Sequence, residues 1–177
     1  MLKNLPAGPK GKVPDIVYCI VEVPMNSRMK YEVDDKTGAI FVDRVLYSTL
    51  TYPGDYGTIP STLSGDGDPL DVLVIVTAPN YPGVVIPVRP VGMLVTKDEK
   101  GKDTKIIAVP DSKVDPRFKE IEDIKNIPEH IREEIKYFYE HYKELEPKKW
   151  VKVVGFKDAK AAKKEIQEAV NNFKTKK

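Results

Sequence analysis

Residues 66–76 read DGDPLDVLVIV, an acidic turn that leads directly into an apolar run. A short apolar run that follows turn residues is typical of a buried β-strand, which is expected here over 72–76. The segment therefore predicts a core strand with three carboxylates directly before its N-terminal end. These carboxylates belong to Asp66, Asp68 and Asp71.

Further candidate strands lie on both sides of this segment, rich in Val and Ile and separated by turns that contain Pro or Gly. They are expected over 16–23, 40–46, 84–93 and 105–109. The last third of the chain has a different period. Apolar residues in 128–146 recur at alternating spacings of four and three, which predicts one amphipathic helix. The residues of this stripe are Ile131, Ile135, Phe138, Tyr142 and Leu145.

Pro128 suits the first turn of this helix, and Pro147 is expected to stop it. A second helix is expected to begin after Asp158, whose side chain can cap the first turn. Its predicted buried face consists of Ala159, Ala162, Ile166, Ala169 and Phe173. Short strands followed by two helices predict an α+β fold, mainly β, with a small five-stranded OB-like barrel and two flanking α-helices toward the C-terminus. Residues 1–177 are expected to form a single domain.

The composition excludes several classes of protein. The 177 residues include 29 basic and 27 acidic side chains, and the net charge of +2 is too balanced to indicate a nucleic-acid or membrane partner. A signal-peptide core and an apolar stretch of ~18 residues are both missing, so a cytoplasmic location is expected. The single cysteine, Cys19, lies in the apolar run 17–21 and is interpreted as a small buried hydrophobic residue.

The acidic turn is the strongest chemical signal. Like charges held together cost free energy unless a cation neutralises them, and hard divalent cations prefer carboxylate oxygens. Gly67 allows a sharp turn and Pro69 fixes φ, so the loop can be curled and stiff. A curled loop could bring Asp66 and Asp71 onto one ion while Asp68 points elsewhere. Taken alone, however, a D-x-D turn is more often only a solvated acidic turn.

A second charged segment, DEKGKDTK at 98–105, is typical of a hairpin turn. Combined with the acidic turn, it could complete a multi-metal site in which Asp103 is a further ligand. The rigid segment 52–60 could supply Tyr56 as a hydrogen-bond donor. Tyr142, on the helix stripe, is better explained in isolation as a core tyrosine whose hydroxyl needs a partner. The basic candidates, each more often a surface charge when taken alone, are Lys30, Arg44, Lys105 and Lys143.

Several familiar sites are excluded by spacing. An EF-hand requires glycine at its sixth and glutamate at its twelfth position, where this chain has Asp71 and Thr77. The phosphate loop G-x-x-x-x-G-K-[ST] and the hydrolase elbow G-x-S-x-G are absent. His130 and His141 are eleven residues apart, too far for a zinc pair at i and i+4, and both are expected on a helix surface.

The acidic turn resembles the signature of the family I (soluble) inorganic pyrophosphatases, D-[SGDN]-D-[PE]-[LIVMF]-D-[LIVMGAC], which reads DGDPLDV here. Other segments resemble the same family, in order and at its spacing, so the resemblance covers nearly the whole chain. They are KYEVDDKTGAIFVDR (30–44), YPGDYGTIPSTLSGDGDPLDVLV (52–74), RPVGML (89–94), DEKGKDTKIIAVP (98–110) and EHYKELEPKKWVKV (140–153). One departure is Thr58, where the family usually has an aromatic residue.

The resemblance implies Mg²⁺-dependent hydrolysis of pyrophosphate in the cytoplasm, by a homohexamer of the prokaryotic type. It implies that Asp68 takes a proton from the attacking water. The implied Mg²⁺ ligands are Asp66, Asp71 and Asp103 for the activating ion, and Asp98 and Glu32 for further ions. The implied phosphate-binding residues are Lys30, Arg44, Tyr56, Lys105, Tyr142 and Lys143. Glu22 and Lys149 match positions farther from the reacting groups.

Two rival functions fit parts of the same pattern. The alternative is an OB-type nucleic-acid-binding module, although this would need stacking aromatics and a basic groove in place of an acidic concave face. A Ca²⁺-binding structural protein would use the acidic clusters for stability. It would leave Lys30, Arg44 and Lys105 without a purpose.

Overall fold

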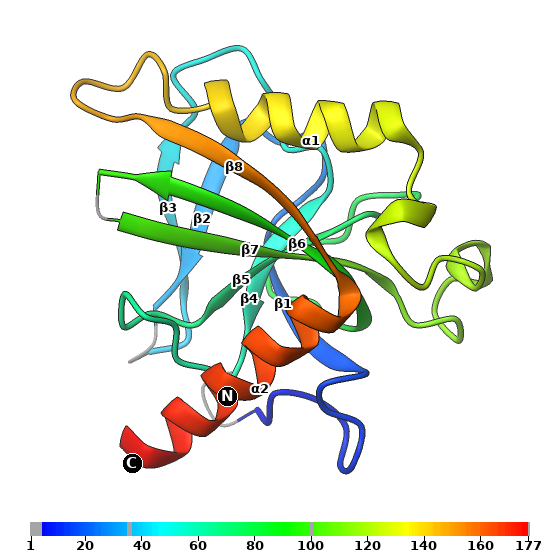
Figure 1. Cartoon of the computed structure of the whole chain (residues 1–177). Coiled ribbons are helices and arrows are strands. Elements are labelled where there is room, and N and C mark those ends of the chain that lie inside the picture. Colours follow the sequence, from blue (N-terminus) through cyan, green and yellow to red (C-terminus); the bar gives the residue numbers. More distant parts are fainter. Residues whose placement is uncertain (1–4, 35–36, 100, 177) are drawn as a thin grey trace.

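The computed structural model describes residues 5–34, 37–99 and 101–176. Strands dominate the chain, and the two α-helices lie in its last third (Figure 1). The strands are β1 (Val17–Val23), β2 (Met29–Val33), β3 (Ile40–Val45), β4 (Asp55–Ile59), β5 (Leu70–Val74), β6 (Val85–Asp98), β7 (Gly101–Pro110) and β8 (Val151–Asp158). The helices are α1 (Glu129–His141) and α2 (Ala159–Lys176), with short 3₁₀ turns η2 (Pro116–Phe118) and η3 (Ile124–Asn126).

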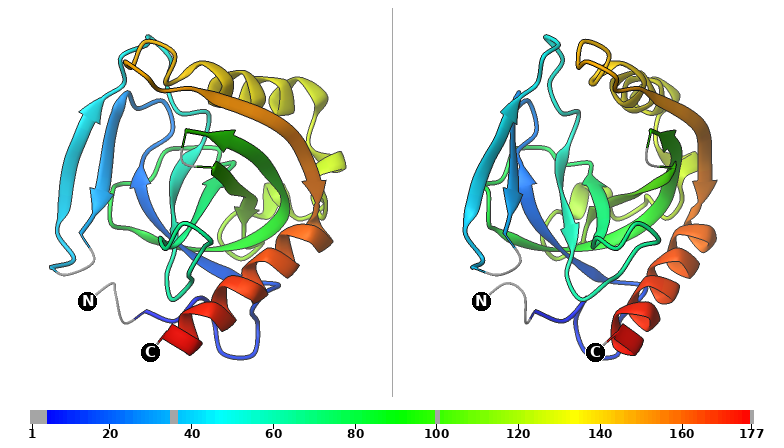
Figure 2. Two further views of the ribbon diagram at one scale, coloured as in Figure 1. Left: turned by 60° about the vertical axis from the view of Figure 1, so that its left-hand side comes forward. Right: turned by 90° about the vertical axis from the view of Figure 1, so that its left-hand side faces the viewer.

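Five strands form a closed ring. The hydrogen-bonded order is β1-β4-β5-β7-β6, and residues 85–88 of β6 pair back onto β1. β8 pairs with residues 92–98 of β6, on the edge opposite β7. The pairing of β5 with β7 is parallel and the other pairings in the ring are antiparallel. A separate hairpin, β2–β3, stands beside the ring (Figure 2). The mainly-β, α+β class with five ring strands and two helices confirms the predicted OB-like architecture.

The ring strands bury both of their faces, in two different hydrophobic clusters. Because successive side chains point to opposite faces, Val72 and Val74 join one cluster and Leu73 joins the other. Helix α2 completes the first cluster and helix α1 completes the second, and the two helices lie on different sides of the strands (Figure 1). Cys19 is fully buried in the first cluster, which confirms its interpretation as a core residue.

Three strands were not predicted. β4 occupies a segment that was expected to be a turn-rich loop, whereas β2 and β8 lack a clean alternation of buried and exposed residues. The β6–β7 pair confirms the hairpin predicted over 98–105, but the turn is shorter because β6 extends to Asp98 and β7 begins at Gly101. Lys100 of the predicted turn lies outside the described residues. Strand β6 passes through Pro87 and Pro90 without ending, because the pairing register shifts beside Pro90.

The first helix is shorter than the predicted 128–146. Pro128 is its N-cap, one position before the first turn, and α1 ends at His141. The chain then continues as tight turns whose backbone hydrogen bonds join residues three apart. The Glu144 N–H donates to the His141 C=O, and the Glu146 N–H donates to the Lys143 C=O. This change of geometry leaves Leu145 64% exposed, so its predicted place on the buried stripe is wrong.

The second helix begins as predicted. The Ala161 N–H donates to the Asp158 Oδ1 at 2.8 Å, which is the expected N-cap bond. Ala162, Ile166 and Ala169 are buried against the ring, while Ala159 and Phe173 are half-buried. Within the described residues, neither helix is both long and apolar enough to cross a membrane.

Gly57 marks the closest approach of β4 to β1. A methyl group at this position would lie 1.9 Å from the Ile20 carbonyl oxygen and 3.0 Å from the Val21 Cα. Backbone atoms of a paired strand cannot yield as a flexible side chain can. We expect Gly57→Ala to lower the free energy of unfolding by about 3 kcal/mol, measured by urea denaturation. Gly65→Ala is the matched control, because nothing lies within 4 Å of its added Cβ. Equal stability of the two variants would contradict this packing.

Candidate active site

The register of β5 and β7 brings three charged side chains to one face of the sheet. Asp71, the second residue of β5, pairs with Lys105 of β7. Asp103 lies two residues before Lys105 on the same strand and therefore points to the same side. Residues far apart in sequence are thus neighbours because of a parallel strand pairing.

Lys105 joins the two carboxylates. Its ammonium forms an ion pair with Asp71 and lies 2.8 Å from the Asp103 Oδ1. Lys105 is 5% exposed. Burial alone would lower the pKa of Lys105, but the charges of Asp71 and Asp103 raise it well above its ordinary value. The ammonium is therefore charged at neutral pH.

The segment after α1 places two lysine side chains against the β6–β7 hairpin. Lys143 Nζ lies 3.3 Å from the Asp98 Oδ2, and Asp98 is buried at the end of β6. Lys149 Nζ lies 2.6 Å from the Glu99 Oε1. Lys143, in the tightened turns after His141, therefore contacts Asp98.

The β2–β3 hairpin contributes a second charged group. Lys30 and Arg44 are paired across the hairpin. The Lys30 ammonium contacts Glu32 and lies 3.5 Å from the Asp43 Oδ2. Arg44 contacts Asp43 and donates from its Nε to the Glu146 Oε1 at 2.9 Å. The Arg44–Glu146 bond links this hairpin to the segment that carries Lys143.

Glu22 connects the hairpin to the ring. Its Oε1 accepts a hydrogen bond from the Val33 N–H at 3.0 Å, and its side chain is buried on β1. Burial, with a smaller contribution from the charge of Asp71, raises the pKa of Glu22 to about 7. The predicted position of Glu22 at the periphery of the site stays a prediction.

Two predicted phenols lie in the second hydrophobic cluster beside Lys105. Its Nζ lies 5.8 Å from the centre of the Tyr56 ring. The Tyr142 ring stacks on Phe138 with centroids 5.0 Å apart. Burial raises the pKa of Tyr56 and that of Tyr142, so both stay neutral and can donate a hydrogen bond without adding charge. Tyr142 is thus both a core residue and a neighbour of the charged group.

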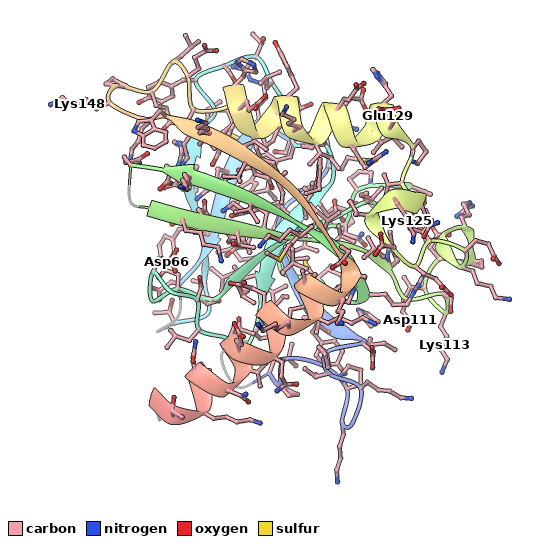
Figure 3. All side chains as sticks on the ribbon, in the orientation of Figure 1. Asp66, Asp111, Lys113, Lys125, Glu129 and Lys148 are labelled. Carbon is pink, nitrogen blue, oxygen red and sulfur yellow. The ribbon has the colours of Figure 1, made fainter. Side chains whose placement is uncertain are left out.

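Asp66 lies on the exposed loop before β5 (Figure 3). Asp68 is an exposed residue of the same loop. The Asp68 N–H donates to the Asp66 Oδ1 at 3.1 Å, and the Ser64 N–H donates to the Asp68 C=O at 2.8 Å. Gly67 has φ of +95°, a conformation that favours glycine. The curled loop is therefore confirmed. The structure leaves both carboxylates solvent-exposed at its tip.

The donor set fits a hard divalent cation. Asp71 and Asp103 both reach the same Lys105 nitrogen, so their oxygens converge on one cationic point, and carboxylate oxygens are the ligands that such cations prefer. Across 5–34, 37–99 and 101–176, however, no three His, Cys, Asp or Glu side chains are already gathered as a metal site. Lys105 occupies the position between the two carboxylates that a cation would take.

Sequence reasoning missed Glu146, Tyr52 and Tyr139. Glu146 anchors Arg44, and its only signal was its place in the segment 140–153. Tyr52 and Tyr139 are fully buried among the aromatic rings behind Lys105. Tyr139 lies three residues before Tyr142, a spacing that puts both on one helix face.

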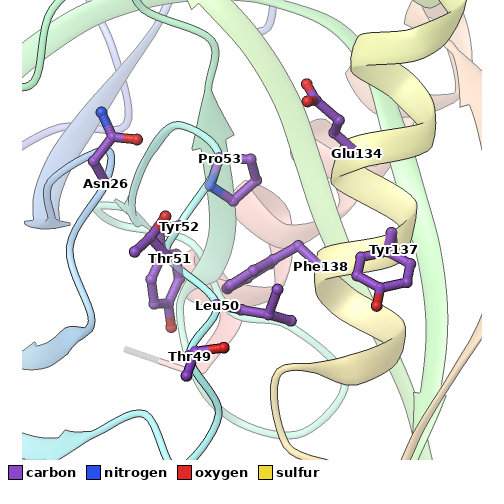
Figure 4. Close-up of a pocket in the computed structure, with 9 residues that line it drawn as sticks. All are labelled: Asn26, Thr49, Leu50, Thr51, Tyr52, Pro53, Glu134, Tyr137 and Phe138. Atoms are coloured by element: carbon purple, nitrogen blue, oxygen red, sulfur yellow. The ribbon is translucent and has the colours of Figure 1, made fainter.

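A separate cavity of about 430 Å³ lies between the segment 49–53 and α1 (Figure 4). Glu134 is the charged residue among the described residues that line it, so its wall does not suit an anion. Tyr52 and Phe138 line this cavity and also belong to the aromatic cluster, with ring centroids 4.8 Å apart. The aromatic rings therefore separate the cavity from the charged group.

The model of the family described as inorganic pyrophosphatase matches residues 19–174. The chain belongs to this family. The chain is 51% identical to the inorganic pyrophosphatase of Aquifex pyrophilus over 97% of this chain and 96% of that one. It is 54% identical to that of Sulfolobus acidocaldarius over 92% and 94%. The crystal structure of the Thermus thermophilus inorganic pyrophosphatase superposes with a TM-score of 0.93, at 51% identity and 98% coverage of both chains. Membership makes the chain a hydrolase of pyrophosphate and implies a divalent metal cofactor.

Proposed function

We propose that this pyrophosphatase uses Mg²⁺ and splits pyrophosphate by attack of a water from which Asp68 removes a proton. The observation that carries the proposal is the convergence of Asp71 and Asp103 on the buried Lys105 ammonium. The two carboxylates can bind a metal ion, and the ammonium held beside them can bind a phosphate. The chain is proposed to act as a single domain, in the cytoplasm, as a homohexamer.

Asp71, Asp103 and Asp66 are the proposed ligands of the activating Mg²⁺, and Asp98 and Glu32 the proposed ligands of further ions. When bound, Mg²⁺ neutralises phosphate charge and acidifies a coordinated water. The residues would supply carboxylate oxygens, which small hard cations prefer. Asp66 lies on the exposed loop, five residues before Asp71 along the chain.

The cationic and phenolic groups are proposed to hold the substrate. Pyrophosphate carries several negative charges near neutral pH, so the residues must offset repulsion of the incoming water. Arg44 can make two parallel hydrogen bonds to one phosphate, whereas a lysine acts as a point charge. The point charges are proposed to be Lys30, Lys105 and Lys143, and the neutral donors Tyr56 and Tyr142.

Asp68 is the proposed general base. A carboxylate can accept a proton from a water that has become more acidic. Its exposed position on the loop leaves it accessible to solvent, from which the attacking water comes. The protonated Asp68 would return its proton to solvent after the products leave.

The proposed pair of hydrogen bonds from the Arg44 guanidinium to one phosphate gives a first prediction. We expect Arg44→Lys to raise KM for pyrophosphate about tenfold, because one of two charge-assisted hydrogen bonds is lost, with a smaller change in kcat. Steady-state kinetics of phosphate release measures both. Arg117→Lys is the control, since Arg117 is 72% exposed and pairs with Asp115 away from the site. Unchanged KM and kcat in Arg44→Lys would rule out a bidentate contact.

A phosphate-release assay with and without Mg²⁺ tests the proposed function itself. We expect hydrolysis of pyrophosphate that requires Mg²⁺ and stops when the metal is chelated. A protein that bound Ca²⁺ but released no phosphate would be a structural cation-binding protein. A salt-dependent gel shift with single-stranded nucleic acid, again without phosphate release, would favour the OB-type binding module.

A further inference from the structure

Thr62 is a buried polar residue that the proposed mechanism does not use. It lies on the loop 60–69, which connects β4 to β5, and 1% of its surface is exposed. Its hydroxyl donates to the Ile59 C=O at 2.5 Å and accepts a hydrogen bond from the Leu70 N–H at 2.9 Å. The hydroxyl therefore both donates and accepts inside the protein.

These two hydrogen bonds join the ends of the strands that the loop connects. Ile59 is the last residue of β4 and Leu70 is the first residue of β5, and the two are paired in the sheet register. The Thr62 side chain bridges this terminal pair and so closes the base of the loop. A valine at this position would have a similar shape, but it would leave the buried Leu70 N–H without this acceptor, which costs free energy.

A second anchor ties the same part of the loop to helix α2. The Leu63 N–H donates to the Ala169 C=O at 3.0 Å, and Ala169 is buried in the first hydrophobic cluster. Farther along the loop, the Ser64 N–H donates to the Asp68 C=O at 2.8 Å. The tip of the loop is exposed, whereas its base is held by the sheet and by the core.

The Thr62 bridge fixes the backbone beside two proposed functional carboxylates. Leu70 lies two residues after Asp68, the proposed general base, and directly before Asp71, a proposed metal ligand. Pro69 restricts the backbone between them, because its ring fixes φ. A shift of the backbone at Leu70 would therefore move Asp68 relative to Asp71. Misplacement of a reacting group by about 1 Å can slow a reaction by about 10²-fold.

We propose that Thr62 is a positioning residue of this pyrophosphatase, whose hydroxyl closes the loop 60–69 and thereby holds Asp68 in a fixed position relative to Asp71. This inference rests on the proposed function, in which Asp68 is the general base. The proposed phosphate-binding residues lie outside this loop. Loss of the Thr62 hydroxyl should therefore lower kcat and leave KM for pyrophosphate nearly unchanged.

Thr62→Val tests the proposal, because it removes the hydroxyl and keeps the size of the side chain. We expect kcat for Mg²⁺-dependent phosphate release to fall about tenfold, with KM within about twofold of the wild type. Thr62→Ser keeps the hydroxyl and should retain most of kcat. Thr62→Cys should give an intermediate kcat, because a thiol is a weaker donor and acceptor. The cysteine variant provides the same test if the valine variant does not fold.

Ile166→Val is the control for lost stability alone. Ile166 is fully buried on α2, and the substitution removes one carbon from the same hydrophobic cluster that holds Ala169. We expect a lower melting temperature and an unchanged kcat. A loss of kcat as large as that of Thr62→Val would overturn the proposal, because it would make the effect one of stability.

A double-mutant cycle assigns the effect to Asp68. In an Asp68→Asn background, we expect Thr62→Val to lower kcat no further. A wild-type kcat in folded Thr62→Val or Thr62→Cys would overturn the proposal, and so would a full effect of Thr62→Val that persists in the Asp68→Asn background. Failure of the wild type to release phosphate in the same series would instead overturn the proposed function.

Discussion

Asp68→Asn is expected to keep Mg²⁺ binding and to lower kcat by at least about 10²-fold. The amide retains the size and shape of the carboxylate but cannot accept the proton of the attacking water. Because the proposed ligands of the activating metal are other carboxylates, the substitution should leave the calorimetric Mg²⁺ affinity nearly unchanged. Single-turnover phosphate release then measures the chemical step.

Asp15→Asn is a suitable control for this experiment. Asp15 has a side chain 70% exposed and pairs with Lys163 at the surface, and we expect its substitution to leave kcat unchanged. Normal turnover in Asp68→Asn would remove Asp68 from its proposed role. A loss of Mg²⁺ affinity equal to the loss of activity would instead make Asp68 a metal ligand.

Lys105→Met carries the second large expected effect. The ammonium is buried between two carboxylates, and removal of one partner from a buried ion pair leaves uncompensated charge. In the absence of metal, we expect the free energy of unfolding to fall by about 3 kcal/mol. Added Mg²⁺ should recover much of this loss, because it replaces the missing positive charge. Phosphate release should still fall by at least about 10²-fold, since the substrate loses a cation.

Urea denaturation with and without Mg²⁺ measures the first part of this prediction, and steady-state kinetics the second. Lys102→Met is the matched control on the same strand, because Lys102 is 54% exposed and pairs loosely with Glu165 at 3.5 Å. Similar losses of stability in both variants would show that the charge of Lys105 is not held by the carboxylates as described.

The strands that sequence reasoning found were those with continuous apolar runs, such as β5. The three that it missed have weaker patterns for physical reasons. The backbone of β1 lies so close to Gly57 of β4 that a side chain would not fit there. In the sequence, this glycine and the turn residues near it are typical of a loop. β2 and β8 are only partly covered, so their side chains do not alternate cleanly. Tertiary contact decides these strands more than local preference does.

The candidate site was predictable where a motif marks it and unpredictable where it depends on strand register. Nothing in the local sequence places Asp71 beside Lys105, since their contact follows from a parallel pairing across 34 residues. Glu146 was missed because it was predicted to be the last residue of a helix that instead ends at His141. The turns that replace the last helical residues aim Lys143 at Asp98 and Glu146 at Arg44.

The proposed function depends most on Asp71 and Asp103 as joint ligands of a divalent cation. Anomalous diffraction from crystals of the enzyme soaked with Mn²⁺, an analogue of Mg²⁺, tests this directly. We predict a peak within about 2.5 Å of a carboxylate oxygen of each residue, with the Lys105 ammonium displaced from the position between them. Anomalous peaks confined to other parts of the molecule, with the Lys105 ion pairs intact, would contradict the account.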